Sequence, residues 1–371
     1  MAATLQVQEF ALWDALKARR RPLSFEIEVT ARCNLNCRHC YINLPAADRE
    51  AEQRELSVPE ISDLADQAVR LGAVWCLITG GEPLLRPDLA EIYMALKRRG
   101  LLLSVFTNAT LLTEEHIRLL KRFPARDLEV TVYGVTRQTY ERVTRRAGSF
   151  ERFRRGLARL AEAGVRVRLK AMVLRSNLEE FPAMSAFGRA HTKDFHRFDA
   201  QLHLRFDGDP ARNETIKSER LSPEQIAALD RGDEQRARAL VKARSERVEW
   251  DRSKVECDRL FHCAAGNGSF VIGYDGQFRL CSSLWAPGTT FDLRRGTLAE
   301  AWNEHVPRVR ELRSRRPQYL TTCGRCQLRD LCLWCPAHAH LETRAVDGVA
   351  PYFCEVAHAR ETALGPRGPS A

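Results

Sequence analysis

The sequence predicts an α/β fold built on a parallel sheet and followed by a cysteine-rich region. Two observations carry this prediction. Between about residues 23 and 203, short apolar runs alternate about six times with amphipathic stretches, a pattern typical of βαβ units. Beyond them, eight of the twelve cysteines lie between Cys257 and Cys354. A chain of 371 residues is long enough for one barrel with an additional domain.

Six strands are expected, and each is a short apolar run bounded by polar or turn-forming residues. In chain order they are residues 23–30, 74–79, 101–107, 128–133, 165–174 and 196–204. Five helices separate them, with apolar residues repeated at helical spacing, at residues 57–71, 88–98, 113–122, 150–163 and 178–190. The helix at 57–71 has a clear start, because Ser57 and Glu60 can form a capping box.

The segment between the α/β core and the cysteines is expected to be a bridge. It is loop-like up to residue 220 and helical at 221–247, where Ser222 followed by Pro223 suits a helix start. Five parts of the chain are therefore expected: an N-terminal helical segment, the core, the bridge, the cysteine-rich domain and a flexible tail. They span residues 1–22, 23–204, 205–255, 256–360 and 361–371, respectively.

Composition and charge exclude several classes of protein. Hydrophobic residues make up 44% and charged residues 29% of the chain, as in globular rather than disordered proteins. No apolar run approaches the ~18 residues of a membrane helix, and the N-terminus lacks the order of a secretory signal, so we expect a cytoplasmic protein without a membrane partner. The net charge of +10 is spread without blocks of like charge, which does not favour nucleic acid as a partner.

In a cytoplasmic protein, clustered cysteines indicate metal binding rather than disulfides. Cys33, Cys37 and Cys40 form a Cx3Cx2C loop directly after the first expected strand. Three thiolates can occupy three corners of a [4Fe–4S] cluster and leave one iron open to another ligand. From these three residues alone, a zinc site or a chance grouping remains an alternative. Cys76 lies inside the second expected strand and is interpreted as a packing residue.

A second motif, Gly80-Gly81-Glu82-Pro83, ends the second expected strand, one βα unit after the cysteine loop. Glycines allow a ligand to approach the backbone closely. The pair of motifs resembles the radical S-adenosylmethionine (SAM) enzymes over about residues 23–200. The resemblance implies a partial (β/α)6 TIM-like barrel. It also implies SAM as cofactor, bound to the open iron and cleaved reductively to a 5′-deoxyadenosyl radical that abstracts a hydrogen atom from a substrate.

The resemblance assigns roles to individual residues. It implies that Cys33, Cys37 and Cys40 hold the catalytic cluster, that His39 lies beside the adenine, and that Gly80, Gly81, Glu82 and Pro83 meet the ammonium group of SAM. Thr131 falls where related enzymes often have a serine facing SAM, and Asn108 is a further candidate at a strand end; strand packing and turn formation are the alternatives for these two. One arginine between residues 142 and 152 is expected to pair with the SAM carboxylate, and the sequence does not distinguish among them.

The eight later cysteines are spaced like a zinc ribbon or, after a radical SAM core, like the SPASM extension with two auxiliary [4Fe–4S] clusters. By position, the resemblance assigns one cluster to Cys257, Cys263, Cys281 and Cys335, and the other to Cys323, Cys326, Cys332 and Cys354. Two residues separate Cys332 from Cys335 where the family commonly has three. Four thiolates leave no iron free for substrate, which suits electron transfer. His338 and His340, beside Cys335, are interpreted as residues of a helix face, with a hydrogen bond to a cluster sulfur as the alternative.

The SPASM resemblance indicates a peptide or protein substrate. The main hypothesis is oxidative maturation of a ribosomally made peptide through a thioether or carbon–carbon cross-link. The alternatives are formylglycine formation, disfavoured because Ser282 stands where sulfatase-maturating enzymes have aspartate; a dehydrogenase or decarboxylase acting on a peptide; an RNA-modifying enzyme; and a zinc-binding module.

Two further partners are expected. Because about 20 residues precede the core, too few for a leader-binding domain, a separate protein is expected to present the leader peptide. An external electron donor resembling flavodoxin or ferredoxin is also expected, since SAM is cleaved reductively.

Overall fold

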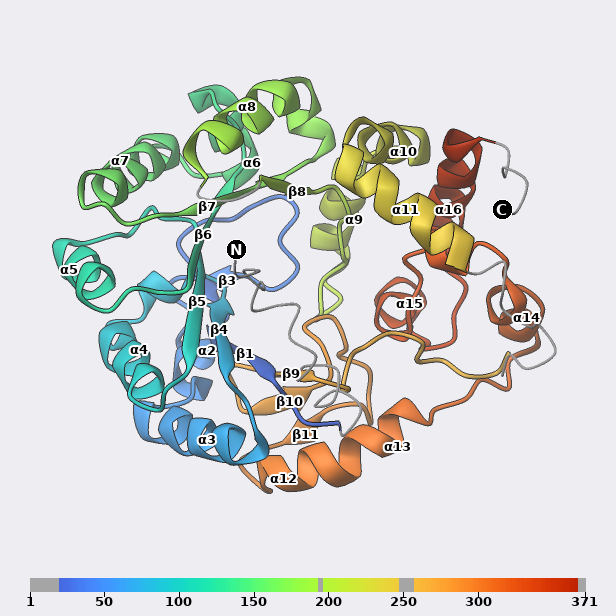
Figure 1. Ribbon diagram of the computed structural model, residues 1–371, viewed down its shortest axis with the longest axis horizontal. Helices are drawn as coiled ribbons and strands as arrows, with labels where there is room; N and C mark the ends of the chain where they lie inside the picture. The colour runs from blue at the N-terminus through green and yellow to red at the C-terminus, as the bar shows by residue number, and fades with distance from the viewer. Residues whose placement is uncertain (1–19, 193–195, 247–256, 366–371) are drawn as a thin grey trace, which may run out of the picture. The chain divides into compact units, whose positions relative to one another are not determined.

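The computed structural model describes residues 20–192, 196–246 and 257–365. The chain divides into two compact units, which are described separately (Figure 1). The first, here called the barrel unit, comprises Met1–Asp199, Ala264–Ser282 and Gly288–Pro307. The second unit comprises Ala200–Cys263, Ser283–Pro287 and Arg308–Ala371. Only residues 20–22 of the expected helical segment at 1–22 and residues 361–365 of the expected tail at 361–371 are described; residues 361–364 are helical, and the five-part division stays a prediction.

The barrel unit is built on a nine-stranded sheet in the order β11-β10-β9-β1-β4-β5-β6-β7-β8. All six predicted strands are present and run parallel: β1 (Ser24–Thr30), β4 (Trp75–Gly80), β5 (Leu102–Thr107), β6 (Asp127–Val132), β7 (Arg168–Met172) and β8 (Arg197–Asp199). The α/β fold class and its partial TIM-like barrel are therefore confirmed. A separate short pair joins β2 (Arg32–Cys33) to β3 (Leu44–Pro45).

Three further strands come from the expected cysteine-rich domain, where the sequence predicted no strand. β9 (Ser269–Ile272) pairs in parallel with β1, and β10 (Gln277–Arg279) and β11 (Phe291–Asp292) continue the sheet in antiparallel order. They are two to four residues long, so they carry too little periodic pattern to be found from sequence. Their pairing brings the segment that leads to Cys281 into the same sheet as the segment that leads to Cys33.

All five predicted helices form, and Figure 1 shows helices arranged along one side of the parallel strands. The predicted capping box at Ser57 and Glu60 is present. Two helices were not predicted, because both are short and polar. The helices of this region are α2 (Arg49–Arg54) and α6 (Arg137–Thr144), which are new, and α3 (Val58–Leu71), α4 (Leu89–Lys97), α5 (Glu114–Arg122), α7 (Ser149–Glu162) and α8 (Phe181–His191).

The bridge differs from its prediction. Residues 205–220, read as a loop, contain α9 (Pro210–Glu219), which Asp209 caps with its side chain. The single helical stretch expected at 221–247 is two helices, α10 (Pro223–Gly232) and α11 (Glu234–Glu246), which separate at Asp233 because its backbone is extended. Later elements are α12 (Leu298–Glu300), η5 (Ala301–His305), α13 (Val306–Arg310), α14 (Pro317–Thr321), η6 (Cys323–Arg325), η7 (Arg329–Leu331), α15 (Pro336–Thr343) and α16 (Pro351–Leu364).

Alternate residues of the parallel strands form the core beneath the helices. Phe25, Ile27 and Val29 of β1 are each 1% exposed, and Val130 and Val132 of β6 are fully buried. Cys76 is buried on the same face of β4, which agrees with its interpretation as a packing residue. In the described ranges, no helix combines the length and apolar character needed to cross a bilayer.

Gly156 shows how tightly the helices contact the strand ends. A Cβ atom at this position of α7 would lie 2.1 Å from the carbonyl oxygen of Ala109, in the loop that follows β5. We expect Gly156→Ala to destabilise the protein by about 1–3 kcal/mol through overpacking, although alanine normally stabilises a helix relative to glycine. Thermal unfolding measures the effect. Gly232→Ala, at a helical position with no atom within 4 Å of the added carbon, is the control; equal melting temperatures for both variants would contradict the packing.

Candidate active site and metal centres

The two sequence motifs of the barrel unit meet at the C-terminal ends of β1 and β4. The backbone N–H of Gly81 donates to the Thr30 carbonyl (2.7 Å), and that of Glu82 donates to the Arg32 carbonyl (2.9 Å). These bonds continue the pairing of the two strands beyond their regular ends. The glycine loop is therefore bound directly to the chain that enters the cysteine loop at Cys33.

Both glycines are required by this contact. A Cβ atom on Gly80 would lie 2.1 Å from the Thr30 carbonyl oxygen, and one on Gly81 would lie 2.3 Å from that of Arg32. Gly80 also has a φ of +133°, which side chains rarely adopt. The sequence suggested that glycines let a ligand approach; in the structure they let two segments of the protein approach each other.

Glu82 is 1% exposed and accepts three hydrogen bonds, two of them from the end of β5. Its carboxylate accepts from the Thr107 hydroxyl (2.6 Å), the Asn108 N–H (2.7 Å) and the Leu84 N–H (3.1 Å). Burial raises its pKa to about 7 despite these donors. A cationic group placed here would favour the ionised carboxylate, so the site fits an ammonium ligand. Pro83 is buried and begins the short helix η2 (Pro83–Leu85).

The three cysteines of the Cx3Cx2C loop lie together. Burial, and after it the negative charges of Cys37, Glu82 and Cys40, raises the pKa of the Cys33 thiol. Such thiols ionise readily when a metal supplies positive charge, so the donor set fits an iron–sulfur cluster. In the described part of the chain, no three His, Cys, Asp or Glu side chains surround a single metal-ion position. A four-iron cluster instead takes each thiolate on a different iron.

The cysteine loop is held by α6, a helix that the sequence did not predict. The N–H of Asn36 donates to the Thr144 carbonyl and that of Arg38 to the Val143 carbonyl, both at 3.0 Å. Cys40 closes the loop by donating its N–H to the Cys37 carbonyl (3.2 Å).

Asn108, at the end of β5, contacts the cysteine loop. Its amide nitrogen donates to Asn34 Oδ1 (3.0 Å) and lies 3.9 Å from Cys33 Sγ, and its oxygen accepts from the hydroxyl and N–H of Thr110. These contacts orient the loop that carries Cys33. A role in SAM binding stays a prediction for Asn108.

An aromatic column lies beside the cysteine loop. The ring of His39 is 5.4 Å from that of Tyr133, which lies 5.6 Å from Tyr140. Burial, and after it the charge of Cys37, raises the pKa of both phenols. Thr131 lies on β6 between the buried Val130 and Val132, so its side chain is on the opposite face of the sheet.

Two arginines of the segment 142–152 have defined contacts. Arg142 donates to the Thr139 hydroxyl (3.1 Å) and the Ser176 carbonyl (2.7 Å). Arg152 donates one Nη to the Ala147 carbonyl (3.2 Å), and its buried Nε has no hydrogen-bond partner among the described residues. The Nε–H of Arg152 can therefore donate to an anionic ligand. The guanidinium group of Arg142 already donates to Thr139 and Ser176.

The sequence reasoning missed a charged inner face of the sheet. Glu28 of β1 pairs with Arg279 of β10, and both are almost fully buried. Glu129 of β6 pairs with Arg197 of β8 at 2.8 Å. Burial, and then the charge of Glu28, raises the pKa of Glu26 to about 7. Alternating charges in FEIEVT and DLEVTV were the available signal, because parallel strands covered on both faces are usually apolar throughout.

In the second unit, four cysteines line one cavity of about 270 Å³. They are the four expected in one auxiliary cluster: Cys323, Cys326, Cys332 and Cys354. Backbone N–H groups of Leu328 and Trp334 donate to the sulfurs of Cys326 and Cys332, at 3.3 and 3.4 Å.

Cys335 is not among the lining residues, although a ribbon of two CxxC pairs would use it in place of Cys354. Its sulfur accepts from the N–H of His338 (3.4 Å), at the start of α15. His338 lies on that helix, as interpreted, with its ring against Phe353. Cys257 and Cys263 belong to this unit and Cys281 to the barrel unit, so the second auxiliary set stays a prediction.

Two family models match the chain. The model of the radical SAM superfamily matches residues 27–187, and that of the SPASM iron–sulfur cluster-binding domain matches residues 263–327. Among curated proteins, an AdoMet-dependent heme synthase of Methanosarcina barkeri is 27% identical over 85% of this chain and 91% of its own length. The Fe-coproporphyrin III synthase of the same organism is 26% identical over 82% and 80%. The subtilosin biosynthesis protein AlbA of Bacillus subtilis is 25% identical over 84% and 68%.

Solved structures share the fold. SuiB of Streptococcus suis bound to S-adenosylmethionine superposes with a TM-score of 0.66 at 16% identity, covering 92% of this chain and 80% of that one. SuiB bound to its precursor peptide SuiA gives a TM-score of 0.62 at 15% identity, with coverages of 90% and 77%. The enzyme anSMEcpe with AdoMet and a peptide gives 0.64 at 13% identity, with coverages of 92% and 96%.

Substitutions should show that the two cysteine sites have different roles. Replacing Cys33, Cys37 and Cys40 with alanine should abolish cleavage of SAM, because only that set leaves an iron open. Replacing Cys323 and Cys326 should remove about four irons per chain and spare part of the SAM cleavage. Iron analysis and chromatography of 5′-deoxyadenosine give the two readouts. Stoichiometric zinc in the anaerobically prepared protein, or SAM cleavage by the triple variant, would contradict the assignment.

Proposed function

Because the chain belongs to the radical SAM enzymes and carries a C-terminal SPASM domain, we propose that it oxidises a peptide and closes a cross-link within it. The observation that carries the proposal is the cavity lined by four thiols in the second unit. An enzyme that needed only to generate a radical would not require a second, fully thiolate-bound centre. A centre without an open iron can accept the electron that remains when a substrate radical becomes a closed-shell product.

The radical SAM domain implies SAM and a [4Fe–4S] cluster, and the SPASM domain implies auxiliary iron–sulfur clusters. When bound, SAM and its cluster supply the radical that removes one hydrogen atom from the substrate. We propose three clusters in total: one on Cys33, Cys37 and Cys40, and two on the eight later cysteines.

The residues of the barrel unit hold and orient SAM. The glycine loop presents its backbone, and the Glu82 carboxylate fixes that loop to Thr107 and Asn108 while favouring a cation nearby. Arg152, with its remaining Nε donor, is proposed to bind the SAM carboxylate. His39 is proposed to contact the adenine from the aromatic column that continues through Tyr133.

The overall reaction balances without further oxidant. With SAM and the clusters bound, one substrate hydrogen atom would leave in 5′-deoxyadenosine. The later cysteines would hold a cluster that accepts the remaining electron, while a base takes one proton and the new bond forms. The product is lighter by two hydrogen atoms, and an external electron donor of flavodoxin or ferredoxin type supplies the electron that cleaves SAM.

The proposed substrate is a peptide, presented by a separate leader-binding protein. Two relatives support a peptide. The match to AlbA, named for subtilosin biosynthesis, covers 84% of the chain, and the PqqA peptide cyclase of Gluconobacter oxydans is 31% identical over 45% of it.

A second candidate for the substrate is an iron porphyrin. It is favoured by the relatives named heme synthase and Fe-coproporphyrin III synthase, which match over more than 80% of the chain at slightly higher identity than AlbA.

Mass spectrometry distinguishes the candidates. The anaerobically reconstituted protein, with SAM and dithionite, is offered candidate precursor peptides in one reaction and Fe-coproporphyrin III in another. We expect a peptide lighter by two hydrogen atoms, with one 5′-deoxyadenosine formed per cross-link. The protein with Cys323 and Cys326 replaced is the control and should form no product.

Three outcomes would contradict the peptide cross-link. A changed porphyrin beside unchanged peptides would assign the second candidate. An aldehyde trapped by hydrazine on a cysteine or serine would indicate formylglycine formation. Loss of carbon dioxide from a peptide would indicate a decarboxylase.

A further inference from the structure

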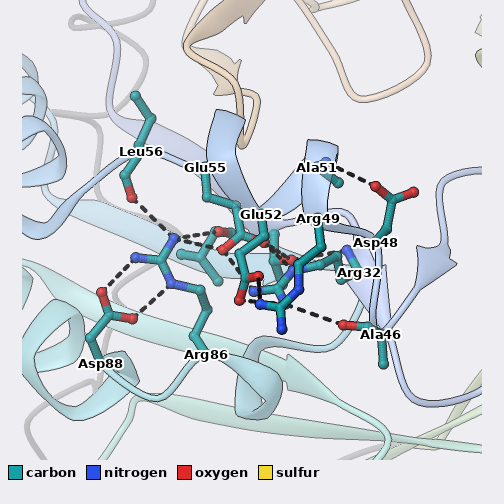
Figure 2. Close-up of polar contacts among 12 residues, drawn as sticks. Arg32, Ala46, Asp48, Arg49, Ala51, Glu52, Glu55, Leu56, Arg86 and Asp88 are labelled. Atoms are coloured by element: carbon teal, nitrogen blue, oxygen red, sulfur yellow. Dashed lines mark hydrogen bonds and ion pairs between the residues drawn. The ribbon is translucent and has the colours of Figure 1, made fainter.

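A network of charged residues with a buried centre connects the two loops of the candidate active site (Figure 2). At its centre is Glu55, whose side chain is 5% exposed. One carboxylate oxygen accepts from Arg32 Nε (2.8 Å) and from the Thr30 hydroxyl. The other accepts from Arg32 Nη2 (3.1 Å) and Arg86 Nη1 (3.3 Å). One carboxylate therefore binds two guanidinium groups.

The two arginines belong to the two loops. Arg32 directly precedes Cys33, and Arg86 lies three residues after Pro83, at the end of η2. Arg86 also donates from Nη1 to the carbonyl oxygens of Val29 (3.1 Å) and Leu56 (3.0 Å). The network thus connects the end of β1, the start of the cysteine loop and the end of the glycine loop through a residue that lies in neither loop.

The outer carboxylates of the network are more exposed, and each contacts only one of the two central arginines; Glu52 also pairs with the exposed Arg49. Asp88 binds Arg86 through two bonds of 2.6 and 2.7 Å, and its side chain is 30% exposed. Glu52 binds Arg32 at 3.0 Å and is 37% exposed. At the buried centre, two guanidinium groups share Glu55. Without its charge they would repel each other across a site with little water to screen them.

We propose that Glu55 is a positioning residue for SAM binding, which keeps the cysteine loop and the glycine loop at a fixed separation. The inference rests on the proposed function, because it assumes that these loops hold the cluster and SAM. Glu55 is not itself among the residues proposed to hold the cluster or SAM. It acts through Arg32 on the position of Cys33 and through Arg86 on the position of Glu82.

The test measures SAM binding directly, on reconstituted full-length protein without reductant, so that SAM is not cleaved. Glu55→Gln removes the charge with little change in shape, and Glu55→Asp keeps the charge but shortens its reach. Substitution of a residue that holds a metal ligand in place without binding the metal typically lowers metal affinity or activity by about 10–100-fold. We expect a loss of SAM affinity in this range for Glu55→Gln and a smaller loss for Glu55→Asp.

Asp230 offers a matched control. It is also a buried carboxylate shared by two arginines, Arg236 at 2.7 Å and Arg360 at 2.8 Å, but it lies in the second unit. Asp230→Asn should lower the melting temperature as Glu55→Gln does and leave SAM affinity unchanged. Comparison with Asp230→Asn therefore distinguishes a general loss of stability from a specific loss of SAM affinity.

A spectroscopic readout adds a second measure. SAM perturbs the EPR signal of a reduced cluster only where it binds an open iron. In Glu55→Gln, the SAM-dependent change should need higher SAM concentrations than in the wild type, while the auxiliary signals persist. Wild-type SAM affinity in both Glu55 variants, or a loss no larger than that of Asp230→Asn, would overturn the inference. Absence of SAM binding in the wild type would instead refute the proposed function.

Discussion

The candidate active site depends on one backbone contact, between the glycine loop after β4 and the end of β1. Two main-chain hydrogen bonds join Gly81 and Glu82 to Thr30 and Arg32, and the close approach leaves no room for a side chain on either glycine. Because Cys33 follows Arg32, this contact fixes where a cluster on the cysteine loop would lie relative to the loop proposed to bind SAM. The side chains of Glu82 and Asn108 then tie the same region to the end of β5.

Charge is the second organising feature of the barrel unit. The outer face of the strands is apolar and packs beneath helices, whereas the inner face carries carboxylates and guanidinium groups, most of them paired. Buried pairs of this kind add little stability compared with well-packed apolar residues, but removal of one partner is costly. Their presence on the inner face is therefore better explained by a polar substrate or cofactor than by stability. The pair of Glu28 and Arg279 also joins β1 to the strand that leads to Cys281.

The sequence predicted the regular part of the fold because its signals are local. All six parallel strands and the five helices between them follow from apolar periodicity and caps such as Ser57. The elements that it missed have weak local signals: α6 is short and polar, and β9 to β11 are held by pairing with β1 rather than by their own pattern. Helix α9 was not predicted because the sequence DGDPARNE is typical of a turn. Asp209 and Pro210 nevertheless begin a helix, with Asp209 as its cap.

The candidate sites, like the fold, were predictable from the sequence only where the signal is local. Cysteine spacing identified the four thiols that line the cavity of the second unit, including Cys354, which lies 19 residues beyond Cys335. The sequence could not show that Asn108 contacts Asn34, or that Glu55 lies between Arg32 and Arg86. These contacts join residues more than 20 positions apart, and no spacing rule connects them.

The most direct test of this account is SAM binding by Gly81→Ala. The added carbon would lie 2.3 Å from the Arg32 carbonyl oxygen and 2.5 Å from that of Ala31, and backbone atoms cannot yield as a flexible side chain can. Binding is measured on the reconstituted, unreduced protein, with Gly232→Ala as the control. The account predicts that Gly81→Ala loses SAM binding while the iron of the second unit is retained. SAM binding at wild-type affinity by Gly81→Ala would contradict it.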